Sequence, residues 1–247
     1  MIYIENDSVN PYYNLALEEY FLDGGAPGDI LLLWQNDNTV VVGRYQNTAQ
    51  ETDERFCREN NIKIVRRNTG GGAVYHDLGN LNFSVITDYK QGDDISYGRF
   101  LSVIVETLKK LGVDSQFRGR NDLFAGGRKI SGSAQAVRAG RILHHGTLLC
   151  STDLDMLSGA LRNDPAKYDP KAIPSIRAFV ANIRDFNNTV TVSMLKSRLL
   201  SEYGGRAPLE KHELTETETA GIRLLQKSKY ETWQWNYGES PAVSRKE

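Results

Sequence analysis

The stretch RRNTGGGAVYHDLGN, residues 66–80, is the most distinctive part of the chain and lies between two runs of β-type residues. Its three consecutive glycines permit backbone conformations and a close approach of ligand that side chains would block. Amide N–H groups in such a turn can form a concave anion site, and Arg66 and Arg67 add positive charge and forked donors. The stretch therefore fits a nucleotide phosphate, while a glycine turn that only joins two strands is the alternative.

Polar residues after the glycines favour the binding interpretation. His76, Asp77 and Asn80 place hydrogen-bonding groups against the turn, which a purely structural loop would not require. The stretch is not a P-loop, because the sequence contains no GxxxxGK[ST] pattern, and no GxGxxG follows a predicted strand. Residues 66–80 thus predict an anion site of another kind, placed between strands.

A second polar cluster follows between Asp114 and Cys150. Its charges are unbalanced, since cations at 118, 120, 128, 129, 138 and 141 face acids at only 114 and 122. Lys129 lies between glycines, where its ammonium either points at a ligand or is the surface lysine of a hairpin. Asp122 is either a salt-bridge partner or a carboxylate for Mg²⁺, which prefers oxygen ligands. The cluster indicates a local cationic site.

Cysteine and histidine spacing gives no support for a disulfide framework or a tightly bound metal. Cys57 and Cys150 are the two cysteines, and neither belongs to a metal-binding pattern. His144 and His145 are adjacent, so on a strand they point to opposite faces, and no third ligand has suitable spacing. We therefore expect a reducing compartment and no structural zinc.

Hydrophobic periodicity predicts the elements in the first part of the chain. Residues 2–4 fit a strand, and residues 11–22 fit a helix with Asn10 as N-cap and Pro11 at its first position. Two β-rich runs at 30–34 and 39–43 predict a hairpin. An amphipathic helix follows Ser96 and ends at Gly112.

The second part of the chain changes from strands to helices. Residues 115–150 alternate between β-type runs and turns, whereas residues 153–228 look mainly helical, with Thr215 and Glu218 as a capping box. Because helices interrupt the strands irregularly, we predict an α+β fold with a mixed β-sheet and flanking helices. Residues 237–247 read as a polar tail or linker, so the predicted catalytic domain covers residues 1–236.

Composition narrows the class of protein. The chain has 247 residues, 40% hydrophobic and 25% charged, and its 30 Lys plus Arg nearly cancel 31 Asp plus Glu. This balance is typical of a globular domain rather than a disordered or globally basic nucleic-acid-binding chain. The N-terminus lacks a signal-peptide pattern, and no apolar run of about 18 residues occurs. We expect a cytoplasmic protein with no nucleic-acid or membrane partner.

Five motifs together resemble the lipoate–protein ligase A family over residues 3–243: NLALEE, RRNTGGGAVYHDLGNLNFS, GRNDLF, GRKISGSAQ and HHGTLL. Their order and distances also agree. Biotin ligases share the general fold but use a GRGRxGR-type loop, which is absent here. The resemblance implies a biotin/lipoate ligase-like catalytic domain that converts lipoate and ATP to lipoyl-AMP and then lipoylates an acceptor lysine.

The resemblance also implies roles for individual positions. Lys129 matches the family lysine that contacts both the lipoyl carbonyl and the α-phosphate. The implied nucleotide-binding positions are Arg67, Gly72, Ala73, Val74 and Tyr75, with Asn121 and Asp122 near the phosphates and their Mg²⁺. The implied lipoyl pocket contains Trp34, Gly71 and His76. Fixed donors and cations of this kind lower the barrier to adenylation of a carboxylate.

Two other functions remain as alternatives. An octanoyl or lipoyl transferase of the same fold would need a cysteine thioester, yet Cys150 ends an apolar run and Cys57 also looks structural. A regulator that binds lipoate or nucleotide without catalysis would fit better had Lys129 been replaced.

The resemblance further implies which proteins the chain meets. The expected acceptors are lipoyl domains of 2-oxoacid dehydrogenase E2 subunits and the glycine-cleavage H protein. Complete ligases of the family continue into an accessory domain, so we expect a separate protein or a longer form to supply it. We expect this chain alone to transfer lipoate from preformed lipoyl-AMP better than it activates free lipoate.

Overall fold

The computed structural model describes residues 1–26, 28–161, 175 and 178–240 and contains a large mixed sheet. Its strands lie in the order β11-β1-β2-β6-β10-β9-β8-β7. Strand β1 is parallel to β2 and β11, and every other neighbouring pair is antiparallel. The bounds are β1 Ile2–Glu5, β2 Ile30–Trp34, β6 Asn80–Asp88, β7 Gln116–Arg118, β8 Asp122–Ala125, β9 Arg128–Arg138, β10 Arg141–Leu149 and β11 Glu210–His212. The predicted α+β fold with a mixed sheet is confirmed.

A second sheet of three strands corrects the predicted hairpin. It has the order β4-β3-β5, with bounds β3 Thr39–Val42, β4 Lys63–Arg66 and β5 Val74–His76. Strand β2 does not pair with β3 but lies between β1 and β6 in the large sheet. The turn separates them because Asn36 hydrogen-bonds Asn14 of the first helix and His76 of β5. Side-chain bonds to distant elements therefore redirect the chain between the two sheets.

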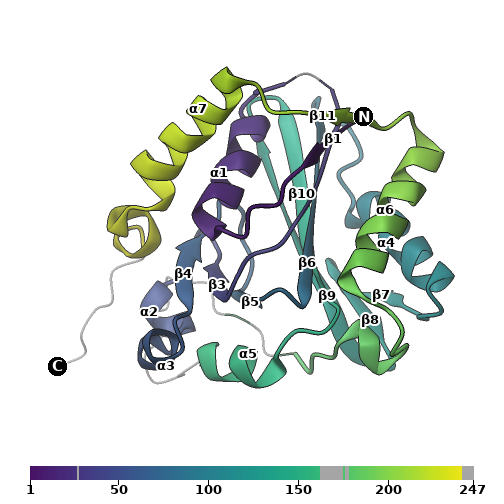
Figure 1. Ribbon diagram of the computed structural model, residues 1–247, viewed down its shortest axis with the longest axis horizontal. Helices are drawn as coiled ribbons and strands as arrows, with labels where there is room; N and C mark the ends of the chain where they lie inside the picture. Colours follow the sequence, from purple (N-terminus) through teal and green to yellow (C-terminus); the bar gives the residue numbers. More distant parts are fainter. Residues whose placement is uncertain (27, 162–174, 176–177, 241–247) are drawn as a thin grey trace.

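Helices cover both faces of the large sheet (Figure 1). Helices α1 and α7 lie on one side, and α4 and α6 lie on the other. The bounds are α1 Pro11–Leu22, α2 Thr48–Glu51, α3 Glu54–Glu59, α4 Tyr97–Lys110, α5 Leu154–Ala160, η2 Ile183–Asp185, α6 Val192–Arg206, α7 Glu216–Leu225, η3 Gln226–Tyr230 and η4 Gln234–Gly238. Because both faces are covered, β2 is buried along its whole length and reads as a continuous apolar run.

Local signals account for the helix ends. The Asn10 side chain accepts a hydrogen bond from the Tyr12 amide at the start of α1, and Thr215 and Glu218 form the predicted capping box of α7. After α4 the chain turns at Gly112 with φ +73°. The prediction of a mainly helical segment at 153–228 missed β11, and residues 162–174 and 176–177 lie outside the described residues.

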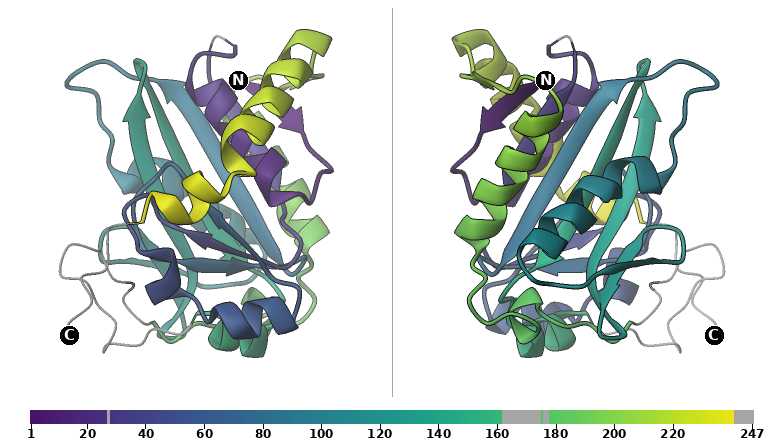
Figure 2. Two further views of the ribbon diagram at one scale, coloured as in Figure 1. Left: turned by 90° about the vertical axis from the view of Figure 1, so that its left-hand side faces the viewer. Right: turned by 90° about the vertical axis from the view of Figure 1, so that its right-hand side faces the viewer.

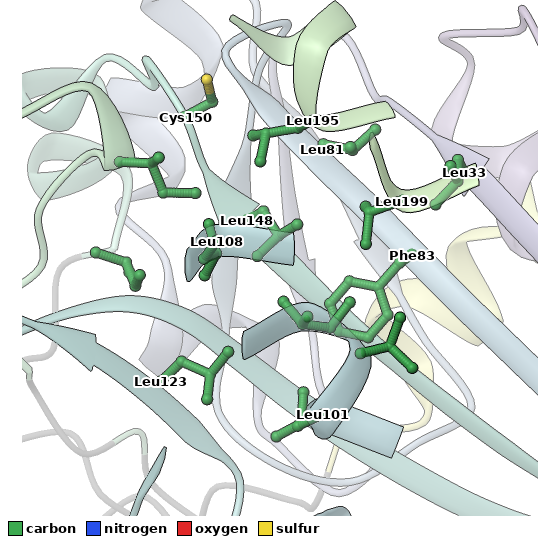
Figure 3. Close-up of a cluster of buried hydrophobic side chains, with 14 of the residues drawn as sticks. Leu33, Leu81, Phe83, Leu101, Leu108, Leu123, Leu148, Cys150, Leu195 and Leu199 are labelled. Carbon is green, nitrogen blue, oxygen red and sulfur yellow. The ribbon is translucent and has the colours of Figure 1, made fainter. Parts of the chain in front are cut away.

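A buried hydrophobic cluster fills the space between the large sheet and the helices α4 and α6 (Figure 3). Phe83 and Leu148 from the sheet pack with Leu101 and Leu108 of α4 and Leu199 of α6. A separate buried cluster lies on the opposite face, against α1. The sheet that carries the candidate site is therefore held by close-packed side chains on both faces.

The C-terminal turns run back over α1 towards the small sheet (Figure 2). The predicted tail begins at Tyr237, and its first four residues contact the domain: Glu239 pairs with Arg44 at 3.1 Å, and Ser240 bonds Arg66. Residues 241–247 lie outside the described residues. None of the helices in the ranges 1–26, 28–161 and 178–240 has both the length and the apolar composition needed to cross a membrane.

Candidate active site

A cavity of about 680 Å³ lies between β9, the buried ends of β2 and β10, and residues 70–74, which we call the glycine loop. The structure brings the predicted site residues together here, with one exception. The predicted residues that line the cavity are Trp34, Arg67, Gly71, Gly72, Ala73, Val74, His76, Asn121, Asp122 and Lys129. Segments from distant parts of the sequence thus form one site.

Tyr75 is the exception and is not among the lining residues. Alternate residues of a strand face opposite sides, so Val74 and His76 face the cavity while Tyr75 faces the small sheet's own core. The Tyr75 hydroxyl donates to the Asn38 side chain at 2.7 Å. A role in ligand binding would therefore have to come from the backbone of Tyr75.

Lys129 is held near the start of β9. Its amide donates to the Phe179 carbonyl at 2.8 Å, and its carbonyl accepts from the Ala181 amide at 2.9 Å, so its backbone is fixed on both sides. Its ammonium lies 2.8 Å from Asp122, and the two side chains are 24% and 25% exposed. A Cβ at position 132 would lie 3.0 Å from the Lys129 Nζ, so Gly132 leaves the space that the ammonium needs.

The glycine loop is folded around the Arg67 guanidinium. The Nη2 group donates to the Gly70 carbonyl at 2.7 Å and to the Gly72 carbonyl at 2.8 Å, and Nη1 donates to Val41 at 3.1 Å. Burial lowers the pKa of Arg67 to about 10, while the charge on Glu18 opposes that shift, so the group stays protonated at neutral pH. Arg67 therefore shapes the loop as well as lining the cavity.

Two glycines, one inside this loop and one outside it, are required for different reasons. Gly71 has φ +91°, a conformation that side-chain-bearing residues rarely adopt. Gly43 approaches so closely that a Cβ there would collide with the Gly71 carbonyl oxygen. The predicted need for glycine in the 70–72 run thus reflects conformation at Gly71, and a distant glycine completes the close packing.

Arg66 does not supply the forked donors that the sequence suggested. It is fully buried, and its guanidinium donates to protein groups only, joining the 43–48 segment to the C-terminal turns. Its acceptors are the carbonyls of Gly43, Arg44, Gln46, Trp235 and Asn236 and the hydroxyls of Thr48 and Ser240. Arg66 is therefore a structural cross-link, and Arg67 alone of the pair lines the cavity.

Part of the cavity lining is apolar and buried. Leu15, Trp34 and Val41 form this part and are each less than 5% exposed. His76 adds one polar group: its Nδ1 accepts from the Asn36 amide at 3.1 Å, which leaves the proton on Nε2. Burial lowers the pKa of His76 to about 3, and the charge on Arg67 adds to the shift, so the ring is neutral.

Several lining residues were not predicted, among them Leu15, Val41, Asn82, His145 and Thr147. The adjacent histidines do face opposite sides, as predicted. His144 stacks on Phe100 with ring centroids 4.7 Å apart, whereas His145 faces the cavity. Strand alternation therefore indicates that one of the two histidines can face a ligand, which is the signal in the sequence for His145. Among the described residues, no group of three or more His, Cys, Asp or Glu could hold a metal ion.

The two cysteines are buried thiols outside the cavity. Cys57 is 1% exposed and Cys150 is 0% exposed, and neither lines the site. Burial raises the pKa of each thiol to about 11, so both are protonated at neutral pH. The predicted structural role of the cysteines agrees with this environment.

Residues 10–204 match the family described as the lipoyl protein ligase A/B catalytic domain. The chain belongs to this family. Lipoate–protein ligase 1 of Staphylococcus aureus is 41% identical over 244 residues, which is 98% of this chain and 74% of that protein. Lipoate-protein ligase LplJ of Bacillus subtilis is 41% identical over 250 residues, covering 98% of this chain and 75% of its own length.

Solved structures of ligases have the same fold. A crystal structure of lipoate-protein ligase A bound with ATP has a TM-score of 0.81 and 31% identity, covering 96% of this chain and 98% of that one. The putative lipoate protein ligase Ta0514 from Thermoplasma acidophilum, with bound lipoic acid, has a TM-score of 0.78 and 30% identity, covering 96% of this chain and 98% of its own. The family assignment and the predicted fold are confirmed.

Proposed function

We propose that the chain is a lipoate–protein ligase that uses ATP to activate lipoate and then lipoylates a lysine of a lipoyl domain. One observation carries this proposal: a single cavity is lined by the glycine loop, by Lys129 and by buried apolar side chains that include Trp34. That lining fits a carboxylic acid with an apolar chain and a nucleotide phosphate. The matched relatives are named as lipoate-protein ligases, and solved relatives contain lipoic acid or ATP.

In the first step, a carboxylate oxygen of lipoate attacks the α-phosphorus of ATP, and pyrophosphate leaves with the P–O bond electrons. Lys129 is the group that stabilises the charge that develops there. An ammonium has three donors, so Lys129 can remain in its ion pair with Asp122 and direct N–H groups at the carboxylate and the α-phosphate. The loop residues Gly72 to Val74 lie where their backbone groups can contact the nucleotide.

In the second step, the neutral ε-amine of an acceptor lysine attacks the acyl carbon of lipoyl-AMP. The amide bond forms, the carbon–oxygen bond to AMP breaks, and the amine loses a proton. The buried apolar part of the cavity holds the lipoyl chain, while the reacting carbon stays near Lys129. A water-poor pocket also protects the mixed anhydride between the two steps.

Magnesium fits this site as part of the ATP complex rather than as a resident metal. Asp122 offers one carboxylate at the cavity, and Asn121, which also lines it, holds the Ser133 carbonyl at 2.6 Å. Mg²⁺ is usually bound through one or two carboxylates plus substrate phosphates and water, which this donor set allows. The described residues contain no three-ligand cluster that would hold the ion without ATP.

The acceptor is a lipoyl domain of a 2-oxoacid dehydrogenase E2 subunit or the glycine-cleavage H protein. A solved structure from Thermoplasma acidophilum supports this part of the proposal, because it is described as a bi-partite lipoate protein ligase and its E2 lipoyl domain. The matched chain is 31% identical to this one, with a TM-score of 0.78, and the match covers 100% of this chain and 97% of that one. The free, buried cysteines suit the cytoplasm, where such acceptors would be met.

The test is ATP-dependent lipoylation of an unmodified lipoyl domain, read by intact-protein mass spectrometry. When the reaction starts from free lipoate, we expect modification only if ATP and Mg²⁺ are also present. Parallel reactions start from preformed lipoyl-AMP or include a separately prepared accessory domain from a ligase. Modification without ATP from an acylated carrier protein, with an acyl group trapped on Cys150, would instead establish the transferase alternative.

A further inference from the structure

A buried chain of hydrogen bonds runs from α1 across β10 to the glycine loop. The Glu18 carboxylate lies 2.8 Å from His145 Nδ1, and His145 Nε2 lies 2.7 Å from the Thr69 hydroxyl. That hydroxyl accepts from Arg67 Nε at 2.9 Å. Glu18, Thr69, Arg67 and His145 are each 7% exposed or less, and the adenylation steps described above use none of them. We call Glu18, His145 and Thr69 the relay.

The donors and acceptors of the relay are satisfied together in one arrangement. In the tautomer with the proton on Nδ1, His145 donates to Glu18, and Nε2 is left as an acceptor. The Thr69 hydroxyl then donates to Nε2, and its lone pairs face the Arg67 Nε–H. The hydroxyl is thus both the donor and the acceptor that join a buried carboxylate to a buried guanidinium.

The far end of the relay reaches the apolar part of the cavity. Ser84 donates to Glu18 at 2.6 Å and accepts from the Trp34 indole at 2.8 Å. The carboxylate is therefore fixed from two sides, by β6 and by β10. A carboxylate held in this way fixes the position of the His145 ring to which it is hydrogen-bonded.

At the other end, the relay fixes the one group around which the loop is folded. Arg67 Nη2 holds the carbonyls of Gly70 and Gly72, so the guanidinium position sets the loop shape. Its Nε–H is held by Thr69 alone among the described residues. A guanidinium that loses this bond can tilt and carry the loop carbonyls with it, because the planar group moves as a unit.

We propose that Thr69, His145 and Glu18 are positioning residues for nucleotide binding, which hold Arg67 and through it the glycine loop in the shape that accepts ATP. This inference rests on the proposed ligase function. It assigns these three side chains to the geometry of the nucleotide-binding loop, although His145 also lines the cavity and Glu18 is linked to Trp34 through Ser84. Thr69 does not line the cavity and bonds Arg67 directly, so loss of its hydroxyl should weaken ATP binding more than it changes lipoate binding or the folded state.

The primary test compares Thr69→Val, which removes the hydroxyl at similar size, with Thr69→Ser, which keeps it. We expect Thr69→Val to raise the KM for ATP about tenfold or more in a pyrophosphate-release assay, corresponding to about 1.4 kcal/mol. The KM for lipoate should change less than about threefold, and Thr69→Ser should restore most of the ATP affinity. Calorimetric titration with a non-hydrolysable ATP analogue gives the same comparison without turnover.

Thr107→Val is the matched control, because the Thr107 hydroxyl is also fully buried but bonds the Val103 carbonyl within α4. It should leave the KM for ATP unchanged. A double-mutant cycle of Thr69→Val with His145→Phe adds a second readout, since residues of one relay should give clearly non-additive effects on ATP affinity.

Three results would overturn the inference: an unchanged KM for ATP in Thr69→Val, an equal rise in Thr107→Val, or additive effects in the cycle. A failure of the proposed function looks different, because the unmodified chain would then release no lipoate-dependent pyrophosphate. In that case, calorimetry with the analogue still decides whether Thr69 positions a nucleotide site. Glu18→Gln is not the primary variant, since it leaves a buried cation uncompensated and can unfold the protein.

Discussion

Replacement of Lys129 by alanine should abolish adenylation while leaving the fold intact. The side chain contributes little packing, since it is 24% exposed and forms an ion pair with Asp122 at 2.8 Å. A partly exposed ion pair of this kind is worth about 0–1 kcal/mol of stability. For a chain of this size, we therefore expect the melting temperature to fall by no more than about 4 °C.

The expected effect on the reaction is much larger. Among the described residues, three cations line the cavity, Arg67, Arg118 and Lys129, and Lys129 is the one that is proposed to meet both the carboxylate and the α-phosphate. Loss of one preorganised donor typically costs about 3 kcal/mol in the transition state, which is a factor of 10² to 10³ in rate. Alanine also leaves the Asp122 carboxylate facing the ATP phosphates without its counter-charge, so 10² is the lower bound.

The assay is lipoate-dependent pyrophosphate release, with hydroxylamine added to trap the acyl-adenylate. Arg128→Ala is the matched control, because Arg128 is the preceding residue, carries the same charge and forms a 3.3 Å pair with Asp185. As neighbours on a strand point to opposite faces, Arg128 does not line the cavity. Wild-type rates for Lys129→Ala, or equal losses in both variants, would refute the proposed role of Lys129.

Three further predictions follow from the buried groups. Cys150→Ser should retain lipoylation activity with a modest loss of stability, since the thiol is protonated and outside the cavity; loss of activity in a folded variant would contradict the adenylate route. Gly43→Ala should raise the KM for ATP at least tenfold, because its Cβ would strike the Gly71 carbonyl; an unchanged KM would show that the loop can move aside. Burial lowers the pKa of His144 to about 3, so the unfolded state binds more protons below the usual pKa of about 6.5, and stability should be lost as pH falls from about 6.5 to 3. His144→Phe should reduce that slope by up to about 1.4 kcal/mol per pH unit, measured by urea unfolding across this range.

Local sequence signals predicted the elements that depend on neighbouring residues. The N-cap of α1 and the capping box of α7 rely on side chains within three residues of the helix start, so the sequence shows them directly. The alternation of His144 and His145 follows from strand geometry in the same way. Such features need no knowledge of the rest of the fold.

Long-range pairing could not be predicted with the same means. The runs at 30–34 and 39–43 look like a hairpin because they are close in sequence, yet they belong to different sheets. Their true partners lie far along the chain, and the side-chain bonds of Asn36 that redirect the turn involve the first helix and β5. Pairing between distant strands is set by the whole core rather than by a local pattern.

In the candidate site, too, the sequence showed the local motifs but not the long-range contacts. The motifs identified the polar end of the cavity, because glycines and cations with defined spacing have few structural uses in this combination. They did not show that the Arg66 guanidinium is hydrogen-bonded to the C-terminal turns. Those bonds form only when Trp235 and Asn236 fold back onto β4. The sequence likewise could not join Glu18 to His145, which are separated by 127 positions. Contacts of this kind exist only after the fold has formed.

The most direct measurement of the central claim follows the carboxylate oxygens of lipoate. Lipoate labelled with ¹⁸O in its carboxylate is supplied with ATP, Mg²⁺ and an unmodified lipoyl domain, and the phosphorus products are analysed by mass spectrometry. If the carboxylate attacks the α-phosphorus and the lysine then attacks the acyl carbon, one ¹⁸O must appear in AMP for each lipoyl group transferred. Formation of lipoyl-lysine with no ¹⁸O in AMP would contradict an acyl-adenylate intermediate.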